Sequence, residues 1–151
     1  MTRRWTRHLP TAIALAIISA GCSTSSLTSM ASKSLFNEMG GMDSMSKLSN
    51  GLLSSSARDG RLSGLMGKAD VAKVQPKLSN QLCSMLGGGC AAPLTEQQIA
   101  DGAKRVTPEQ SKALTENLGS SLGRMDLPSA LTDSVKKAVA PKLGGIMGAL
   151  L

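Results

Sequence analysis

Hydrophobic residues recur every three or four positions through the second half of the chain, which is the spacing of amphipathic helices. The first such stripe consists of five aliphatic residues: Val71, Val74, Leu78, Leu82 and Met85. It predicts a helix that begins near Asp70 and stops before the run 87–89, which is Gly-Gly-Gly. Because proline has no amide hydrogen, we expect Pro76 to kink or restart this helix.

Two further helices are predicted from their first residues. Thr95 with Gln98, and Thr107 with Gln110, have the spacing of a capping box, in which the two side chains exchange hydrogen bonds with the backbone. Pro108 suits the first helical position of the second helix, which Gly123 should end. The residues expected to face inward from these two helices are Ile99, Ala103, Val106, Leu114, Leu118 and Leu122.

A last helix is predicted to begin at Pro128 and to bury Leu131, Val135 and Val139 until Pro141 interrupts it. The uncharged run 143–151 follows. Gly144 and Gly148 lie at the spacing that lets helices approach closely. We expect this run to cover the core as a last helix or tail, since nine residues are too few to span a bilayer. The alternative is a membrane-inserting or self-associating segment.

The first part of the chain has a weaker pattern. Residues 23–34 are rich in Ser and Thr and predict a flexible tether. Residues 35–67 contain many Gly, Ser, Met and Leu residues, and the five glycines at positions 40, 41, 51, 60 and 64 argue against one long helix. We expect broken helices there, or partial disorder.

Composition favours an all-α protein. Residues 22–151 contain 19 Leu and 8 Met but only 5 Val and 2 Ile, and unbranched or γ-branched side chains keep more rotamer freedom in helices than β-branched ones. We therefore predict a small irregular helical bundle behind the tether. The expected division is 1–21, 22–34, 35–67 and a helical domain over 68–151.

The N-terminus has the pattern of a signal peptide. Arg3, Arg4 and Arg7 precede an apolar run over 12–20, which as a helix would be only about 14 Å long and too short to span a membrane. Thr6 and Arg7 stand where a twin-arginine signal would have its hydrophobic pair, so the general export route is expected.

Small residues lead directly to a cysteine at the end of this run: Ala20, Gly21 and Cys22. This stretch resembles the lipobox of bacterial lipoprotein precursors. The resemblance implies that residues 1–21 are removed and that Cys22 becomes acylated. Ser23 follows the cysteine, which by the same resemblance favours the periplasmic face of the outer membrane. An ordinary secretory signal with a chance cysteine is the alternative.

Removing residues 1–21 from the 151-residue chain leaves 130 residues and lowers the formal net charge from +7 to +4, because three arginines are lost. The only histidine, His8, and the only tryptophan, Trp5, are lost as well. Without histidine the commonest general base and the usual zinc ligand are missing. With Phe36 as the single aromatic residue, base stacking on nucleic acid has almost no platform. We expect no enzyme, no cofactor, no metal and no nucleic-acid partner.

Cys83 and Cys90 are the two remaining thiols. An even pair in an exported chain predicts a disulfide. A redox-active pair is the alternative, but it would favour a C-x-x-C motif at a helix N-terminus, whereas Cys83 lies near a predicted helix C-terminus.

The segment 94–102 (LTEQQIADG), followed by the helix from Thr107, is similar to the paired helices of uncharacterised VcgC/VcgE-type bacterial envelope proteins. That similarity covers about 30 residues, rests on helix-start signals and implies no known activity. The sequence as a whole predicts a non-enzymatic envelope lipoprotein, structural or interacting with an envelope protein, which contacts the membrane through its N-terminal lipid. The alternative function is a membrane-active or lipid-binding helical protein.

Overall fold

The computed structural model describes residues 35–151, which contain helices and no strand. The predicted all-α fold is confirmed. Residues 1–34, with the predicted signal peptide and tether, lie outside the described part. After a helical turn at 35–39, the elements are α2 (Gly41–Arg58), the 3-10 helix η1 (Gly60–Leu62), α3 (Ser63–Met66), α4 (Val71–Met85), α5 (Glu96–Ala103), α6 (Pro108–Gly123) and α7 (Ser129–Leu150).

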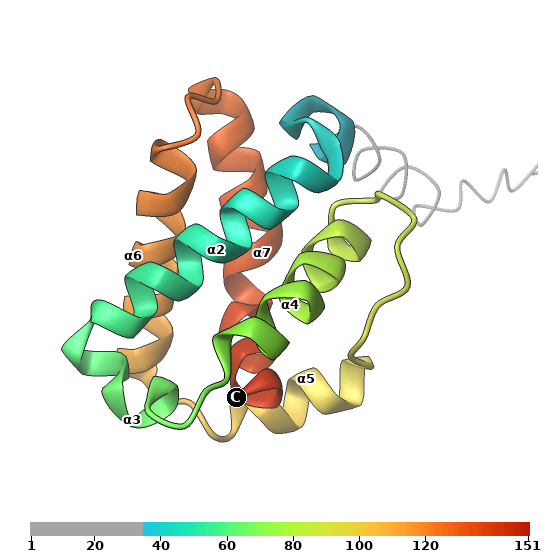
Figure 1. Ribbon diagram of the computed structural model, residues 1–151. Helices are drawn as coiled ribbons and strands as arrows, with labels where there is room; N and C mark the ends of the chain where they lie inside the picture. Colours follow the sequence, from blue (N-terminus) through green and yellow to red (C-terminus); the bar gives the residue numbers. More distant parts are fainter. Residues whose placement is uncertain (1–34) are drawn as a thin grey trace, which may run out of the picture.

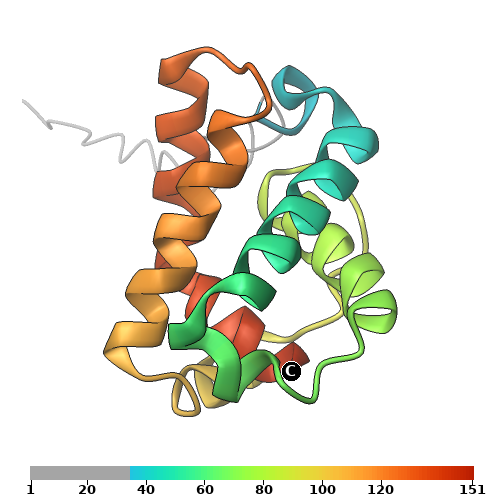
Figure 2. The same cartoon turned by 60° about the vertical axis from the view of Figure 1, so that its left-hand side comes forward.

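The helices form an irregular bundle around α7, the longest of them (Figure 1). Helix α7 packs against α5, α6 and α4, and α2 packs against α4 and α6. Helices α6 and α7 run side by side from a short loop (Figure 2), and α5 crosses the C-terminal end of α7. Residues 86–95 form a long connection from α4 to α5 along one edge of the molecule.

Residues 35–67 form broken helices, which was one of the two structures expected there; the other was partial disorder. The helices are broken at fewer places than their glycines suggested, because α2 continues through Gly51 for 18 residues. Its stripe of Met45, Leu48 and Leu52 is fully buried, and burial of this kind outweighs the helix propensity lost at one glycine, which is about 1 kcal/mol.

Both predicted capping boxes are present. The amide of Gln98 donates to Thr95 Oγ1 at 3.2 Å, and the amide of Gln110 donates to Thr107 Oγ1 at the same distance. In return, the glutamine side chains accept from the amides of Thr95 and Thr107. These boxes begin α5 and α6 where the sequence predicted them.

One prediction about a proline needs correction. Pro141 was expected to interrupt the last helix, but α7 runs through it from Ser129 to Leu150. Helix α4 also continues through Pro76, which excludes a restart, one of the two effects expected there. Both prolines are exposed. A proline inside a helix removes one hydrogen bond and crowds the carbonyl four residues earlier; in α7 this carbonyl belongs to Lys137, an exposed residue. Packing of α7 on both sides of Pro141 keeps the helix continuous.

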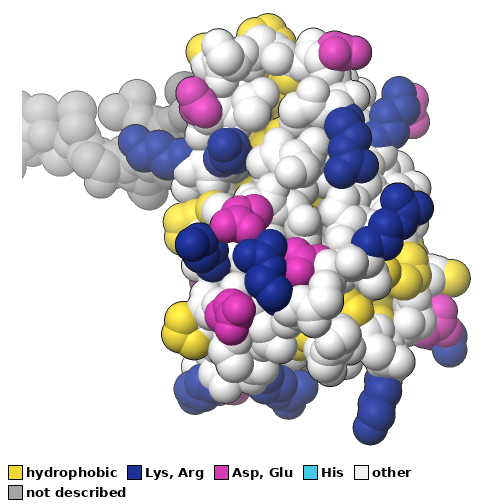
Figure 3. All heavy atoms as spheres, turned by 90° about the vertical axis from the view of Figure 1, so that its left-hand side faces the viewer, with side chains coloured by type: hydrophobic (Ala, Val, Ile, Leu, Met, Phe, Trp, Pro, Cys, Tyr) yellow, Lys and Arg dark blue, Asp and Glu magenta, His cyan; other side chains and the backbone are white. Residues whose placement is uncertain are grey.

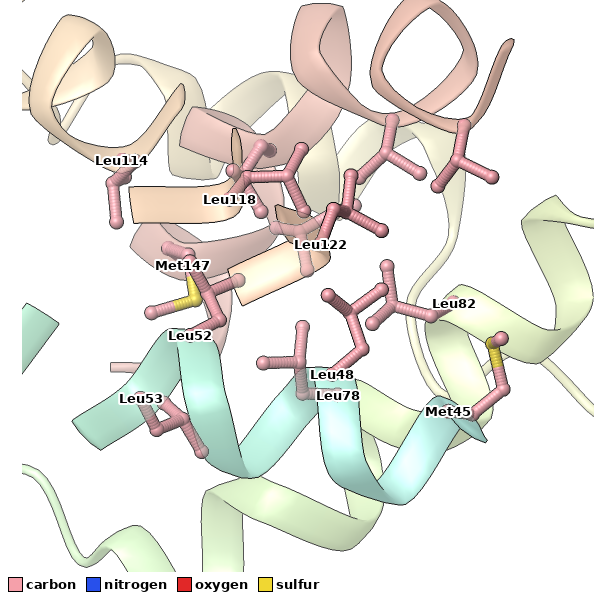
Figure 4. Packing of buried hydrophobic residues seen from close by; sticks show 14 of the residues in the cluster. Met45, Leu48, Leu52, Leu53, Leu78, Leu82, Leu114, Leu118, Leu122 and Met147 are labelled. Atoms are coloured by element: carbon pink, nitrogen blue, oxygen red, sulfur yellow. The ribbon is translucent and has the colours of Figure 1, made fainter. Parts of the chain in front are cut away.

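One hydrophobic core joins all the long helices. Leucines from α2, α4 and α6 point toward one another and toward Met147 of α7 (Figure 4). Residues of 35–67 and of 68–151 belong to the same buried cluster. The fully buried large side chains include Met45, Leu48, Leu52, Leu53, Leu62, Leu78, Leu82, Leu86, Leu114, Leu118, Leu122, Leu143, Ile146 and Met147.

Helices α5 and α7 approach each other closely at three glycines, Gly102, Gly145 and Gly148. A Cβ atom on Gly148 would overlap the carbonyl oxygen of Gly102, and one on Gly145 would overlap the carbonyl oxygen of Ile99. The close contact therefore uses Gly145 and Gly148, not the predicted pair with Gly144, which faces Ser111 of α6. Ala103 is exposed, contrary to prediction, because Gly102 occupies the buried position of α5.

The run 143–151 is the end of α7 and part of the core. Residues 143–148 are buried, and Leu150 and Leu151 are half-buried against the cluster. This agrees with the expectation of a last helix that covers the core. No helix within residues 35–151 is both long enough and apolar enough to cross a membrane.

Candidate functional site

Cys83 and Cys90 form a disulfide, with their Cα atoms 5.8 Å apart. The predicted pairing is therefore present in the structure. Cys83 is fully buried in the last turn of α4, and Cys90 is half-buried after the glycine run. Gly87 and Gly89 have positive φ angles of 83° and 75°, which glycine adopts without strain. Cys22 lies outside the described residues.

The start of the described chain docks onto this disulfide. The amide of Phe36 donates a hydrogen bond to the carbonyl of Leu86 at 3.2 Å. Gly88 lies between the Phe36 ring and the disulfide, since a Cβ atom there would come within 2.6 Å of the ring. The sulfur of Met42 lies 3.5 Å from Cys90 Sγ. The segment 35–42 therefore packs against the disulfide loop through Phe36 and Met42.

A cluster of ion pairs joins the end of α2 to α6. Arg61 binds Asp59 at 2.9 Å and Glu116 at 2.8 Å, and Asn117 donates to Asp59 at 3.2 Å. The hydrogen bonds from Arg61 lower the pKa of Asp59 from 3.8 to about 2. Because every charge in this cluster already has a partner, we assign it a structural role at the surface.

A cleft of about 420 Å³ lies between the first half of α2 and the C-terminal end of α6. We call it the α2–α6 cleft. It contains apolar, hydroxyl and charged side chains together, and it is lined by Met39, Ser44, Lys47, Gly51, Ser121, Arg124, Met125, Asp126 and Leu127.

The α2–α6 cleft brings together a buried hydroxyl without a hydrogen-bond partner, a residue with a positive φ angle and two cations that form no salt bridge within residues 35–151. Ser121 is only 3% exposed, and its hydroxyl has no hydrogen-bond partner among residues 35–151. Asp126 has a φ of 50°, the one positive value among the described non-glycine residues. Arg124 donates to Ser55 Oγ at 3.1 Å, yet within the described chain neither Arg124 nor Lys47 forms a salt bridge with a carboxylate.

The sequence did not predict this cleft, although it carried one signal. Lys47 and Gly51 lie one helical turn apart on α2, and a glycine within a helix that is otherwise well packed costs about 1 kcal/mol relative to alanine. The structure explains why a glycine is found there: a Cβ atom at position 51 would lie only 3.3 Å from the Ser121 side chain. The other half of the cleft comes from residues 70 positions away.

A second hollow of about 520 Å³ lies between the end of α4, the 86–95 connection and α7. Its two charged residues, Glu96 and Lys142, bind each other at 2.7 Å. Within residues 35–151 no group of three or more His, Cys, Asp or Glu side chains is placed to hold a metal ion.

No protein-family model, no curated protein and no solved structure matches this chain.

Proposed function

We propose that this chain is a non-enzymatic lipoprotein of the bacterial envelope. In this proposal acyl chains on Cys22 hold it at the periplasmic face of the outer membrane, and the helical domain acts there as a structural or interaction module for an envelope protein. The observation that carries the proposal is the sequence Ala20-Gly21-Cys22 at the end of a charged and then apolar N-terminal segment.

The surface of the helical domain supports anchoring by lipid over anchoring by the domain itself. Met42 and Val71 are the only large hydrophobic residues among 35–151 that are exposed, at 40% and 39%. On the face seen in Figure 3, Lys and Arg side chains are mixed with Asp and Glu, and apolar side chains form only small patches. A protein that inserts into lipid needs a continuous apolar face, and the run 143–151 is used inside the bundle.

The proposal is tested by growing cells with an alkyne fatty acid and detecting label on the protein. We expect the wild type to be labelled and the Cys22→Ala variant to be unlabelled. A Ser23→Ala variant controls for the neighbouring change and should keep its label. An unlabelled wild type, or label that persists in Cys22→Ala, would refute lipid attachment at Cys22.

A further inference from the structure

We propose that the α2–α6 cleft is a binding site for a small amphiphilic carboxylate. Lys47 and Arg124 pair with the carboxylate, Ser121 donates a hydrogen bond to it, and the apolar part of the ligand lies against Met39 and Met125. This inference goes beyond the anchoring function and is independent of it.

The charges in the cleft fit an organic monoanion. Lys47, Arg124 and Asp126 together leave the lining with one net positive charge. A guanidinium binds a carboxylate through two parallel hydrogen bonds, and within residues 35–151 no carboxylate forms a salt bridge with Lys47 or Arg124. A phosphate monoester would bring nearly two negative charges at neutral pH and match this lining less well.

The hydroxyl of Ser121 supplies the second, independent observation. A buried hydroxyl without a partner destabilises a fold, because it has lost its hydrogen bonds to water. Ser121 lines the cleft and packs closely against Gly51, where a Cβ atom would come within 3.3 Å of the hydroxyl oxygen. A Ser121 hydroxyl turned from this contact toward the cleft would find its missing partner in a ligand carboxylate. The left-handed backbone of Asp126 at the same cleft fits this picture, because strained residues cluster at binding sites.

The remaining walls suit an apolar body. Met39 is buried and Met125 and Leu127 are half-buried, and methionine side chains adapt to ligands of irregular shape. A volume of about 420 Å³ lies within the range of small-molecule sites. The larger hollow at Glu96 and Lys142 lacks this combination, since its two charges neutralise each other.

Hexanoate is a suitable probe, because it joins a carboxylate to a short apolar chain. The protein is the chain from residue 22 onward, with Cys22→Ser to prevent acylation and with methionine methyl groups labelled for NMR. We expect saturable shifts of the Met39 and Met125 methyl signals, whereas Met66 and Met147 stay unchanged. Acetate lacks the apolar chain and hexanol lacks the charge, so both should bind at least several times more weakly.

Variants of the two cations test the charge requirement. Replacing both by glutamine (Lys47→Gln with Arg124→Gln) should weaken hexanoate binding by tenfold or more, as expected for the loss of hydrogen bonds between charged groups. Lys77→Gln, an exposed lysine of α4, is the control and should bind normally. The proposal is wrong if Met39 and Met125 do not respond, if hexanol binds as tightly as hexanoate, or if the double variant binds like the wild type.

A pair of serine variants separates a binding role from a structural one. Ser56 is also buried with an unpartnered hydroxyl in the described chain, but it does not line the cleft. Ser121→Ala and Ser56→Ala should both raise the Tm, because each removes an unsatisfied polar group. Only Ser121→Ala should weaken hexanoate binding. Equal affinity of the two variants would contradict the role of Ser121.

Discussion

Asp59 lies where α2 ends and η1 begins, and it accepts hydrogen bonds from the backbone and side chain of Arg61 and from Asn117. These bonds favour the ionised carboxylate, so the pKa of Asp59 falls to about 2 in the folded protein. A lowered folded pKa contributes stability that is present above the unfolded pKa and is lost as the pH falls toward the folded value.

The direction of this pKa shift predicts how the stability of Asp59→Asn depends on pH. The variant should have a lower Tm than the wild type at neutral pH, and the difference should shrink between about pH 4 and pH 2 as the wild-type carboxylate becomes protonated. Thermal unfolding followed by circular dichroism measures both. Asp133→Asn, an exposed residue of α7, is the control. A Tm difference for Asp59→Asn that does not change with pH would contradict the account.

Some single-residue features could be predicted from the sequence, and others could not. The threonines and glutamines of the two capping boxes were predictable, because their partners lie three residues away. Ser121 was not, because its surroundings depend on Gly51, which is 70 positions distant in sequence. Local hydrogen bonds follow from spacing, whereas a cleft between two helices follows only from how they pack.

Among the helices, the contact of α5 with α7 depends on glycine. Gly148→Ala should destabilise the protein by about 3 kcal/mol, because the new methyl group would overlap the backbone of Gly102 and force the helices apart. Gly123→Ala is the matched control, since a Cβ atom there meets nothing within 4 Å, and it should be neutral or stabilising by up to about 1 kcal/mol. Urea unfolding measures both variants. Equal effects of the two substitutions would contradict this packing.

The disulfide should stabilise the fold through its loop. A bridge that closes eight residues contributes about 2.5 kcal/mol in the chain-entropy model. The same loop also forms the surface against which Phe36 packs. Reduction of the wild type should therefore lower the urea midpoint, as measured by circular dichroism. The Cys83→Ala, Cys90→Ala double variant should show no further change with reductant. A midpoint that is unchanged on reduction would leave the disulfide without a stabilising role.

The starts of α4 to α7 and the ends of α4 and α6 were predictable from the sequence, whereas the end of α7 was not. Stripes of leucine and the capping residues gave the positions of α4, α5, α6 and the start of α7. Pro141 was misleading, because its cost was judged without the tertiary contacts that hold α7 on both sides of it. The same contacts explain why Gly51 does not break α2.

At the scale of the whole domain, residues 35–151 share one core that joins all the long helices, and Met42 and Val71 are the only large hydrophobic side chains of these residues that are exposed. In our account the lipid on Cys22 sets the location, and the helical domain carries the α2–α6 cleft.

Membrane flotation of lysed cells tests this account most directly. Wild-type protein should float with the outer-membrane fraction. The Cys22→Ala variant, if its signal is still removed by export, should remain with the soluble periplasmic proteins. Mass spectrometry of the variant's N-terminus identifies molecules that kept residues 1–21, and these are excluded from the comparison. A processed variant that still floats with the membrane would contradict the account, because the helical domain itself would then bind lipid.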